Sequence, residues 1–290
     1  MFENIKSGWK LGSAIRKLVF KDKKLLIFPI IAGITILVET IAIFLSLFLY
    51  GAASSTPLVV GLVVYYVIIY FTSAYVLVAM LIAFRSFESG APIGVYDALS
   101  KAAGYWVQVF EWAVFESIVT MIIRAIEQRL GGVGAAIFGL GASMAMSVAT
   151  AFAIPVIVDR KTGPVSTLKE STNFIIKNFG ETFGGLIYSE LYSLIFIGVG
   201  ILLVIAGVFA LGVSAILGVI VAVLGMVLAV FGGMLGYLLS NVYKFVLYDH
   251  MNGGELPEGI TDDMVKSSVK KRMQNRGGLG GMFGANTGNI

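Results

Sequence analysis

Long apolar runs, separated by charged segments, follow one another along most of the chain. A helix needs about 20 apolar residues to cross the hydrocarbon core of a bilayer. Six runs reach that length, and they are Leu25–Leu49, Leu58–Phe84, Trp106–Ile126, Ala135–Val158, Gly185–Ala210 and Ala215–Leu239. No charged residue lies between Ile201 and Leu239, and one helix over that stretch would be about 58 Å long, far more than a core of roughly 30 Å. We therefore expect the chain to turn back at Leu211–Ser214.

The segments that precede the first, third and fifth runs have the periodicity of amphipathic helices. In the first, the apolar residues that share one face at 100° per residue are Phe2, Ile5, Trp9, Ile15 and Val19, and the opposite face carries Lys6, Lys10, Lys17 and Lys21. The second has an apolar face that includes Val95, Leu99, Ala102, Trp106 and Phe110, and the third one that includes Val165, Leu168, Ile175 and Ile176. Helices of this kind lie flat on a membrane surface.

These patterns predict an all-α fold, a polytopic membrane helix bundle of six transmembrane helices with three amphipathic cytoplasmic surface helices. Residues 1–24 form the first surface helix, and residues 25–249 form the six-span membrane domain. Residues 250–290 form a cytoplasmic C-terminal tail, whose Gly- and Asn-rich end is expected to be disordered.

Composition and charge support a membrane location and give the orientation. The chain is 58% hydrophobic and 13% charged, whereas soluble domains carry about a quarter charged residues. Of the 21 Lys and Arg residues, 19 fall on one side of the predicted spans, and only Arg124 and Arg129 fall on the other. The positive-inside rule places the basic side in the cytoplasm. We therefore expect a multi-pass protein of the cell membrane with both its N- and C-termini cytoplasmic.

The residue inventory argues against catalysis. There is no cysteine, and the one histidine is His250, beyond the last apolar run. The sequence also lacks a P-loop, a GxSxG nucleophile motif and an HExxH zinc motif. We expect no enzymatic activity, no cofactor and no bound metal. The expected partners are membrane lipids, with other membrane proteins or a second copy of the chain as open alternatives, and no nucleic acid.

Ionisable and polar residues inside the runs are the candidates for a functional site. Glu39, Glu116 and Glu190 place one acid in each odd-numbered run, and an ionisable side chain at such depth normally faces protein or water. They indicate either a proton or cation site or carboxyl groups that hold helices together by hydrogen bonds. Arg124 either forms an i, i+3 ion pair with Glu127 or pairs with an acid on another helix. Tyr70 either lines a polar path or bonds to a neighbouring helix.

Small residues recur on two of the runs and predict close helix packing. Gly139, Ser143 and Ser147 are spaced by four residues in the fourth run. In the sixth run, Gly225 and Gly232 are spaced by seven, and Gly236 completes a GxxxG motif. The partner helix of either seam could lie in the same chain or in a second copy. Pro155 is expected to kink the end of the fourth run.

Several motifs resemble an uncharacterised family of six-span membrane proteins from bacteria and archaea, a domain of unknown function. The resemblance rests on Thr-x-Phe-x-x-Pro at Thr150–Pro155, on the stretch from Gly163-Pro164 to Gly180-Glu181, and on "VLYDHMNGGELPEG" at Val246–Gly259. It implies the six-span fold and carries no activity.

The function that these features favour is that of a non-enzymatic membrane protein that acts by binding or assembly. It would be a membrane scaffold, a lipid-organising protein or a subunit of a larger membrane complex. The alternative is a small transporter or channel with a polar path near Glu39 and Glu116.

Overall fold

Helix is the only regular secondary structure in the part of the chain that the structure, a computed structural model, describes, which is residues 2–49, 55–177, 179–261 and 264–265. The predicted all-α fold is therefore confirmed. The chain divides into two compact units. The terminal unit joins Met1–Lys21 to Asn178–Ile290, and the central unit is Asp22–Lys177.

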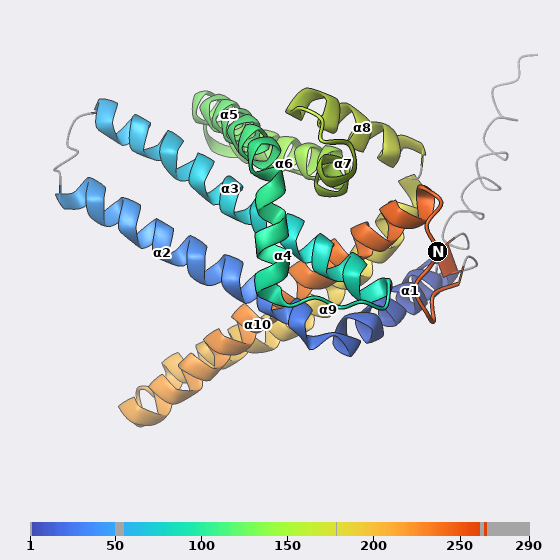
Figure 1. The fold of residues 1–290 in the computed structure, drawn as a ribbon. Helices are drawn as coiled ribbons and strands as arrows, with labels where there is room; N and C mark the ends of the chain where they lie inside the picture. Colours follow the sequence, from blue (N-terminus) through green and yellow to red (C-terminus); the bar gives the residue numbers. More distant parts are fainter. Residues whose placement is uncertain (1, 50–54, 178, 262–263, 266–290) are drawn as a thin grey trace, which may run out of the picture. The chain divides into compact units, whose positions relative to one another are not determined.

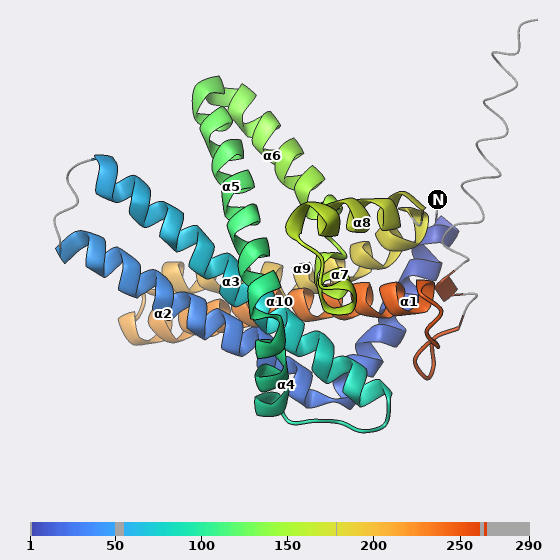
Figure 2. The ribbon, with the colours of Figure 1, turned by 45° about the horizontal axis from the view of Figure 1, so that its top comes forward.

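The central unit is organised around one long helix, α3. Its elements are η1 (Lys23–Leu26), α2 (Ile27–Leu49), α3 (Ser55–Glu88), α4 (Val95–Ala102), η2 (Ala103–Tyr105), α5 (Trp106–Leu130), α6 (Gly132–Ala149), α7 (Ala153–Arg160) and α8 (Pro164–Lys177). α3 contacts α2, α4, α5 and α7, and its C-terminal half, with Val78, Met80 and Phe84, is buried. α2 and α3 form one helical hairpin, and α5 and α6 form a second (Figures 1 and 2).

The fourth apolar run is not one helix with a kink at Pro155. α6 ends at Ala149 and α7 begins at Ala153, so Pro155 lies in the first turn of a new helix, where its missing N–H leaves no intrahelical bond unmade. The break precedes the proline because Pro155 cannot donate to the carbonyl group of Ala151. In the break between α6 and α7, the backbone N–H of Phe152 donates to the Ser171 hydroxyl of α8 (3.1 Å).

Ion pairs connect the polar ends of these helices. Arg85 near the end of α3 makes a two-pronged contact with Asp159 of α7, with N···O distances of 2.6 and 3.1 Å. Arg160 pairs with Glu170 of α8 at 2.9 Å. The charged residues that close the apolar runs therefore hold α3, α7 and α8 together.

The terminal unit is a long helical hairpin with the N-terminal helix packed on it. Its helices are α1 (Phe2–Lys21), α9 (Phe179–Ala210) and α10 (Ala215–Met251). α9 and α10 run side by side (Figure 1), and the predicted turn at residues 211–214 is present between them. α10 extends twelve residues beyond Leu239, where its apolar run was expected to end.

Five helical stretches among the described residues are long and apolar enough to cross a membrane. They are Lys23–Leu49, Val59–Glu88, Gly132–Arg160, Ser189–Ala210 and Ala215–Met251. α5, predicted as the third of six spans, is not among them. It is 25 residues long and carries five charged side chains, namely Glu111, Glu116, Arg124, Glu127 and Arg129.

The amphipathic helices pack on protein along part of the faces expected to meet lipid. In α1, Ile15, Leu18 and Val19 are buried, and the helix contacts α9 and α10. In α4, Ala98 and Ala102 are buried, and Tyr75 of α3 donates to the Leu99 carbonyl group (2.7 Å). The side chains of Phe2, Ile5 and Trp9, and the tail beyond Val265, lie outside the described residues.

In α8 the residues that pack on protein are only in part those of the expected apolar face. Val165 and Ile176 are exposed, whereas Thr167, Ser171 and Ile175 are buried. Thr167 and Ser171 are buried because each forms a hydrogen bond inside the protein. Ser171 accepts from Phe152, and Thr167 bonds to Thr162. Val165 and Ile176 stay available to a membrane surface, as the sequence predicts.

Candidate functional site

The first deep acid, Glu39, has a partner on the neighbouring helix. Thr72 Oγ1 of α3 donates to Glu39 Oε1 of α2 at 2.7 Å. The second carboxyl oxygen, Oε2, is buried, and no hydrogen-bond partner reaches it in the described part of the chain. Glu39 therefore links α2 to α3 through one oxygen and keeps the other available.

The second deep acid, Glu116, lies in α5 beside Tyr70 of α3. Trp112, one turn earlier in α5, hydrogen-bonds to Glu116 through its indole N–H. The Tyr70 hydroxyl bonds to Thr120 Oγ1 of α5 at 2.7 Å, and Tyr70 interacts electrostatically with both Glu116 and Arg124. The Tyr70–Thr120 hydrogen bond therefore joins α3 to the part of α5 between Glu116 and Arg124, and Glu39 has a separate partner.

At the far end of α5, Arg124 forms the i, i+3 pair with Glu127, at 3.1 Å. The Glu127 side chain lies against the backbone of Gly139 in α6, and a Cβ atom at residue 139 would collide with its carboxyl group. Gly139 thus makes room for a carboxylate as well as for a helix. In this ion pair the Arg124 side chain is well exposed, whereas the Glu127 side chain is mostly covered.

Ser143 and Ser147 do not continue the seam that begins at Gly139. Both are exposed, although Gly139 is buried. A strict four-residue spacing advances by about 40° per step around a helix of 3.6 residues per turn. By Ser147 the position has therefore rotated about 80° away from Gly139. Neither serine packs on another described helix of this unit, and a seam with a second copy of the chain stays a prediction.

Glu190, the acid of the fifth run, lies on the surface of α9 and interacts electrostatically with Lys244 of α10. Because α9 begins at Phe179, six residues earlier than expected, Glu190 is about three turns into the helix. Lys244 was expected beyond the sixth apolar run, on the cytoplasmic side, but it lies within α10. The signal was present in "YLLSNVYKFVLYDH", which continues the helical pattern of α10.

Glycines line the contact between α9 and α10. A Cβ atom at Gly225 would lie 2.6 Å from both the Gly200 carbonyl oxygen and the Val204 nitrogen. A Cβ atom at Gly232 would lie 2.7 Å from Phe196 Cβ, and one at Gly236 would lie 2.5 Å from Ser193 Oγ. The Ser193 hydroxyl also donates to the Gly232 carbonyl group at 2.7 Å. The partner of the sixth-run seam therefore lies in the same chain.

Comparison with known proteins identifies the family. A model of a family of unknown function, DUF6159, matches residues 52–257. The chain belongs to this family. No curated protein matches the chain, and no solved structure matches it.

The DUF6159 match reaches from the start of α3 to the turn that follows α10. Tyr70, Glu116, Arg124 and the glycine seam of α9 and α10 lie within it. Glu39 of α2 and the whole of α1 lie before it. The α3–α5 contact and the α9–α10 hairpin are therefore parts of the DUF6159 region itself.

Proposed function

We propose that this DUF6159 chain is a cell-membrane protein with six transmembrane helices and cytoplasmic termini. In this proposal it acts as a scaffold that binds lipids and other membrane proteins, and not as an enzyme. The observation that carries the proposal is the amount of apolar surface that the chain leaves uncovered.

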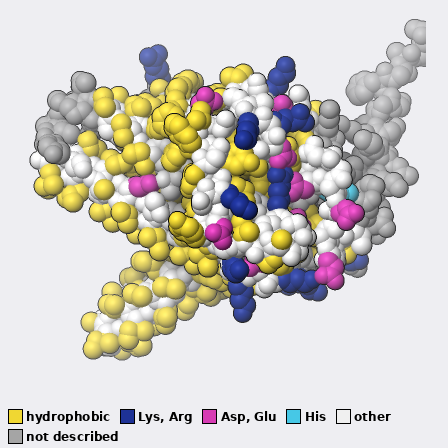
Figure 3. Space-filling model, in the orientation of Figure 1, with side chains coloured by type: hydrophobic (Ala, Val, Ile, Leu, Met, Phe, Trp, Pro, Cys, Tyr) yellow, Lys and Arg dark blue, Asp and Glu magenta, His cyan; other side chains and the backbone are white. Residues whose placement is uncertain are grey.

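The uncovered apolar surface is clearest on α2. Leu37, Val38 and Ile41 are 58, 60 and 57% exposed, and only Phe28, Pro29 and Ala32 of this helix are buried. The part of the α9–α10 hairpin that is visible in Figure 3, toward the turn between the two helices, carries mostly hydrophobic side chains. Each buried aliphatic side chain is worth about 1.5–3 kcal/mol relative to its exposure to water. A bilayer, or a membrane partner, would supply that burial.

In this proposal α5 also crosses the membrane, as the third span in chain order, and it brings the five apolar stretches to six spans. It is long enough, since 25 residues extend over about 37 Å at 1.5 Å per residue. Its charged groups have close partners, because Glu116 accepts a hydrogen bond from Trp112 and Arg124 pairs with Glu127. With six spans, 19 of the 21 Lys and Arg residues lie on one side, as the positive-inside rule favours.

The deep acids also favour a structural role. Glu39 and Glu116 each accept a hydrogen bond from a nearby side chain, as expected for groups that hold helices together. One observation favours the alternative, a transporter or channel. Glu39 Oε2 is buried, and the described residues offer it no hydrogen bond, so this oxygen is available to a proton or a cation.

Glu116 variants test the two functions. We expect Glu116→Gln to be as stable as the parent, because an amide oxygen still accepts from Trp112, whose side chain is buried (2% exposed). Glu116→Leu should lose about 1–3 kcal/mol, the cost of leaving a buried donor unpaired. Thermal unfolding of the purified proteins measures both. Ile118→Leu, at an exposed position of α5, is the control and should change little.

The same proteins, reconstituted in vesicles, distinguish a scaffold from a transporter. A scaffold should make vesicles no more permeable to protons, Na⁺ or K⁺ than protein-free vesicles, whichever residue occupies position 116. A flux that the parent supports and that Glu116→Gln abolishes, with the fold intact, would overturn the proposed function in favour of transport.

A further inference from the structure

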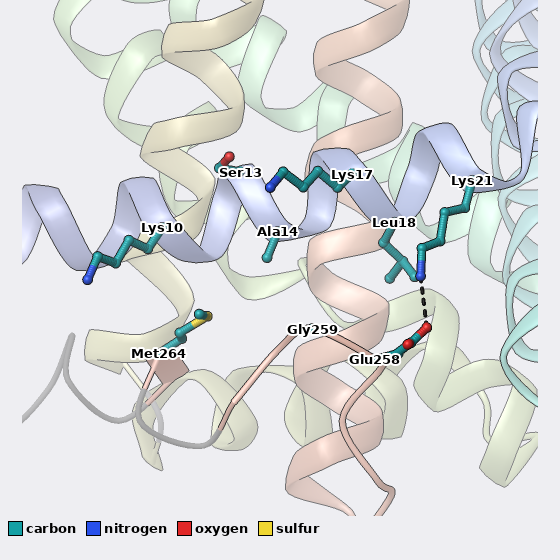
Figure 4. A pocket seen from close by; sticks show the side chains of 9 residues that line it. All are labelled: Lys10, Ser13, Ala14, Lys17, Leu18, Lys21, Glu258, Gly259 and Met264. Atoms are coloured by element: carbon teal, nitrogen blue, oxygen red, sulfur yellow. Dashed lines mark hydrogen bonds and ion pairs between the residues drawn. The ribbon is translucent and has the colours of Figure 1, made fainter.

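A pocket of about 530 Å³ lies in the terminal unit, between α1 and the chain that follows α10. Figure 4 shows α1 on one side of this pocket, with Lys10 and Lys21 toward its two ends, and the segment of Glu258, Gly259 and Met264 on the other. Its lining is both basic and apolar. The lining residues are Lys10, Ser13, Ala14, Lys17, Leu18, Lys21, Glu258, Gly259 and Met264.

The lysines form one stripe along α1. At 100° per residue, Lys10, Lys17 and Lys21 fall within about 40° of one another, over a length of roughly 16 Å. Among the described residues that line the pocket, Glu258 is the one acid, and it pairs with Lys21 at 2.9 Å. The three lysines and one glutamate among these described lining residues leave an excess of two positive charges, which favours an anion.

The lysine stripe is held on the outside of α1 because the opposite face is fixed to the hairpin. Ile15 and Val19 are buried, and the Arg16 guanidinium lies 5.0 Å from the ring centre of Tyr192 in α9. Tyr192 is near the start of the apolar stretch Ser189–Ala210. Tyrosines at the ends of spans sit at the level of lipid headgroups, so the contact places α1 at that level.

We propose that this pocket binds the phosphate headgroup of an anionic phospholipid from the cytoplasmic leaflet. Lys10 and Lys17 would hold the phosphate, while Leu18 and Met264 offer apolar contact to the glycerol end of the lipid. The mixed lining favours a lipid over free phosphate, which has no apolar part. The proposal rests on the proposed membrane location and adds a specific lipid class to it.

Glu258 is the competing anion of this site. Its hydrogen bond from Lys21 holds the pKa of the Glu258 carboxyl below its usual value, so the group is charged at neutral pH. While Glu258 engages Lys21, that lysine is withheld from a bound phosphate. Removal of the carboxylate should therefore strengthen lipid binding, whereas removal of a lysine should weaken it.

Native mass spectrometry of the delipidated full-length protein in neutral detergent, titrated with phosphatidylglycerol or phosphatidylcholine, tests the proposal. We expect preferential binding of phosphatidylglycerol. The double variant Lys10→Gln and Lys17→Gln should reduce its affinity about tenfold or more, since each lysine near a surface contributes up to ~1 kcal/mol. Glu258→Gln should raise the affinity severalfold. Lys169→Gln, an exposed lysine of α8, is the matched control and should have no effect.

An unchanged affinity of the double lysine variant, or a weaker affinity of Glu258→Gln, would overturn the proposal. So would competition by inorganic phosphate at the same concentration as the lipid, because the ligand would then be a free phosphate. Alkaline carbonate extraction of membranes that contain the same variants separates a failure of the lipid pocket from a failure of the proposed function. A chain that stays in the membrane but shows no lysine effect refutes only the pocket, whereas a chain released by carbonate refutes the membrane location.

Discussion

Substitution of Gly225 by a larger residue is expected to destabilise the α9–α10 hairpin strongly. An added Cβ atom would lie 2.6 Å from backbone atoms of Gly200 and Val204, and backbone atoms of a packed helix cannot move aside as a side chain can. We expect Gly225→Ala to cost about 1–3 kcal/mol, the usual range for overpacking. Gly225→Leu should cost more and separate the two helices. Thermal unfolding of the purified variants in detergent measures the loss.

Gly233→Ala is the matched control for that series. Gly233 lies in the same helix, but no atom lies within 4 Å of the position of its added Cβ. Alanine is favoured over glycine inside a helix by roughly 0.8–1.0 kcal/mol, so this variant should be as stable as the parent or slightly more stable. Equal stability of Gly225→Leu and Gly233→Ala would show that α9 and α10 do not pack through the glycine seam.

Ile41→Arg is expected to prevent stable insertion of α2. Ile41 is 57% exposed near the middle of this helix. A central arginine costs about 2.5–3.5 kcal/mol of insertion free energy in a lipid-facing span. On a surface that faces water, the same change is usually within about 0.5 kcal/mol of neutral. The measurement is the amount of carbonate-resistant, monodisperse protein recovered from membranes, which should fall sharply.

Tyr96→Arg is the control for α2. Tyr96 is 82% exposed, but it lies in α4, which is assigned to the membrane surface, so the variant should accumulate as the parent does. If Ile41→Arg accumulates and resists carbonate as well as Tyr96→Arg does, the exposed face of α2 does not meet lipid.

Hydropathy predicted what depends on segment length alone. The all-α fold and the turn at residues 211–214 follow from the length of apolar runs. What covers a face does not follow from periodicity. Lys10, Lys17 and Lys21 were placed opposite Ile15 and Val19, but the pattern could not show that those two residues pack on protein and not on lipid. A helical period identifies an apolar face without identifying its partner.

Partners distant in sequence were the other part that the sequence could not supply. Ser171 faces the protein interior because the break before Pro155 frees the Phe152 N–H to donate to it. Nothing in the sequence around Phe152 or Ser171 indicates that the two residues are partners. Glu190 was predicted as a deep acid, but its electrostatic interaction with Lys244 was not, because Lys244 follows the sixth apolar run, where hydropathy falls while the helix continues. The lysine stripe of α1 was visible in the sequence. Its counter-charge Glu258, 237 residues away from Lys21, was not.

The central claim is that the chain crosses the membrane six times, α5 included, with both ends in the cytoplasm. Because the chain has no cysteine, single cysteines can report on each side. In intact cells an impermeant maleimide should label Val133→Cys and Val213→Cys, and it should label Ser89→Cys and Glu255→Cys only after permeabilisation. If α5 does not cross and the N-terminus is cytoplasmic, Val213→Cys would be protected and Glu255→Cys would be labelled from outside. That pattern would contradict the six-span account.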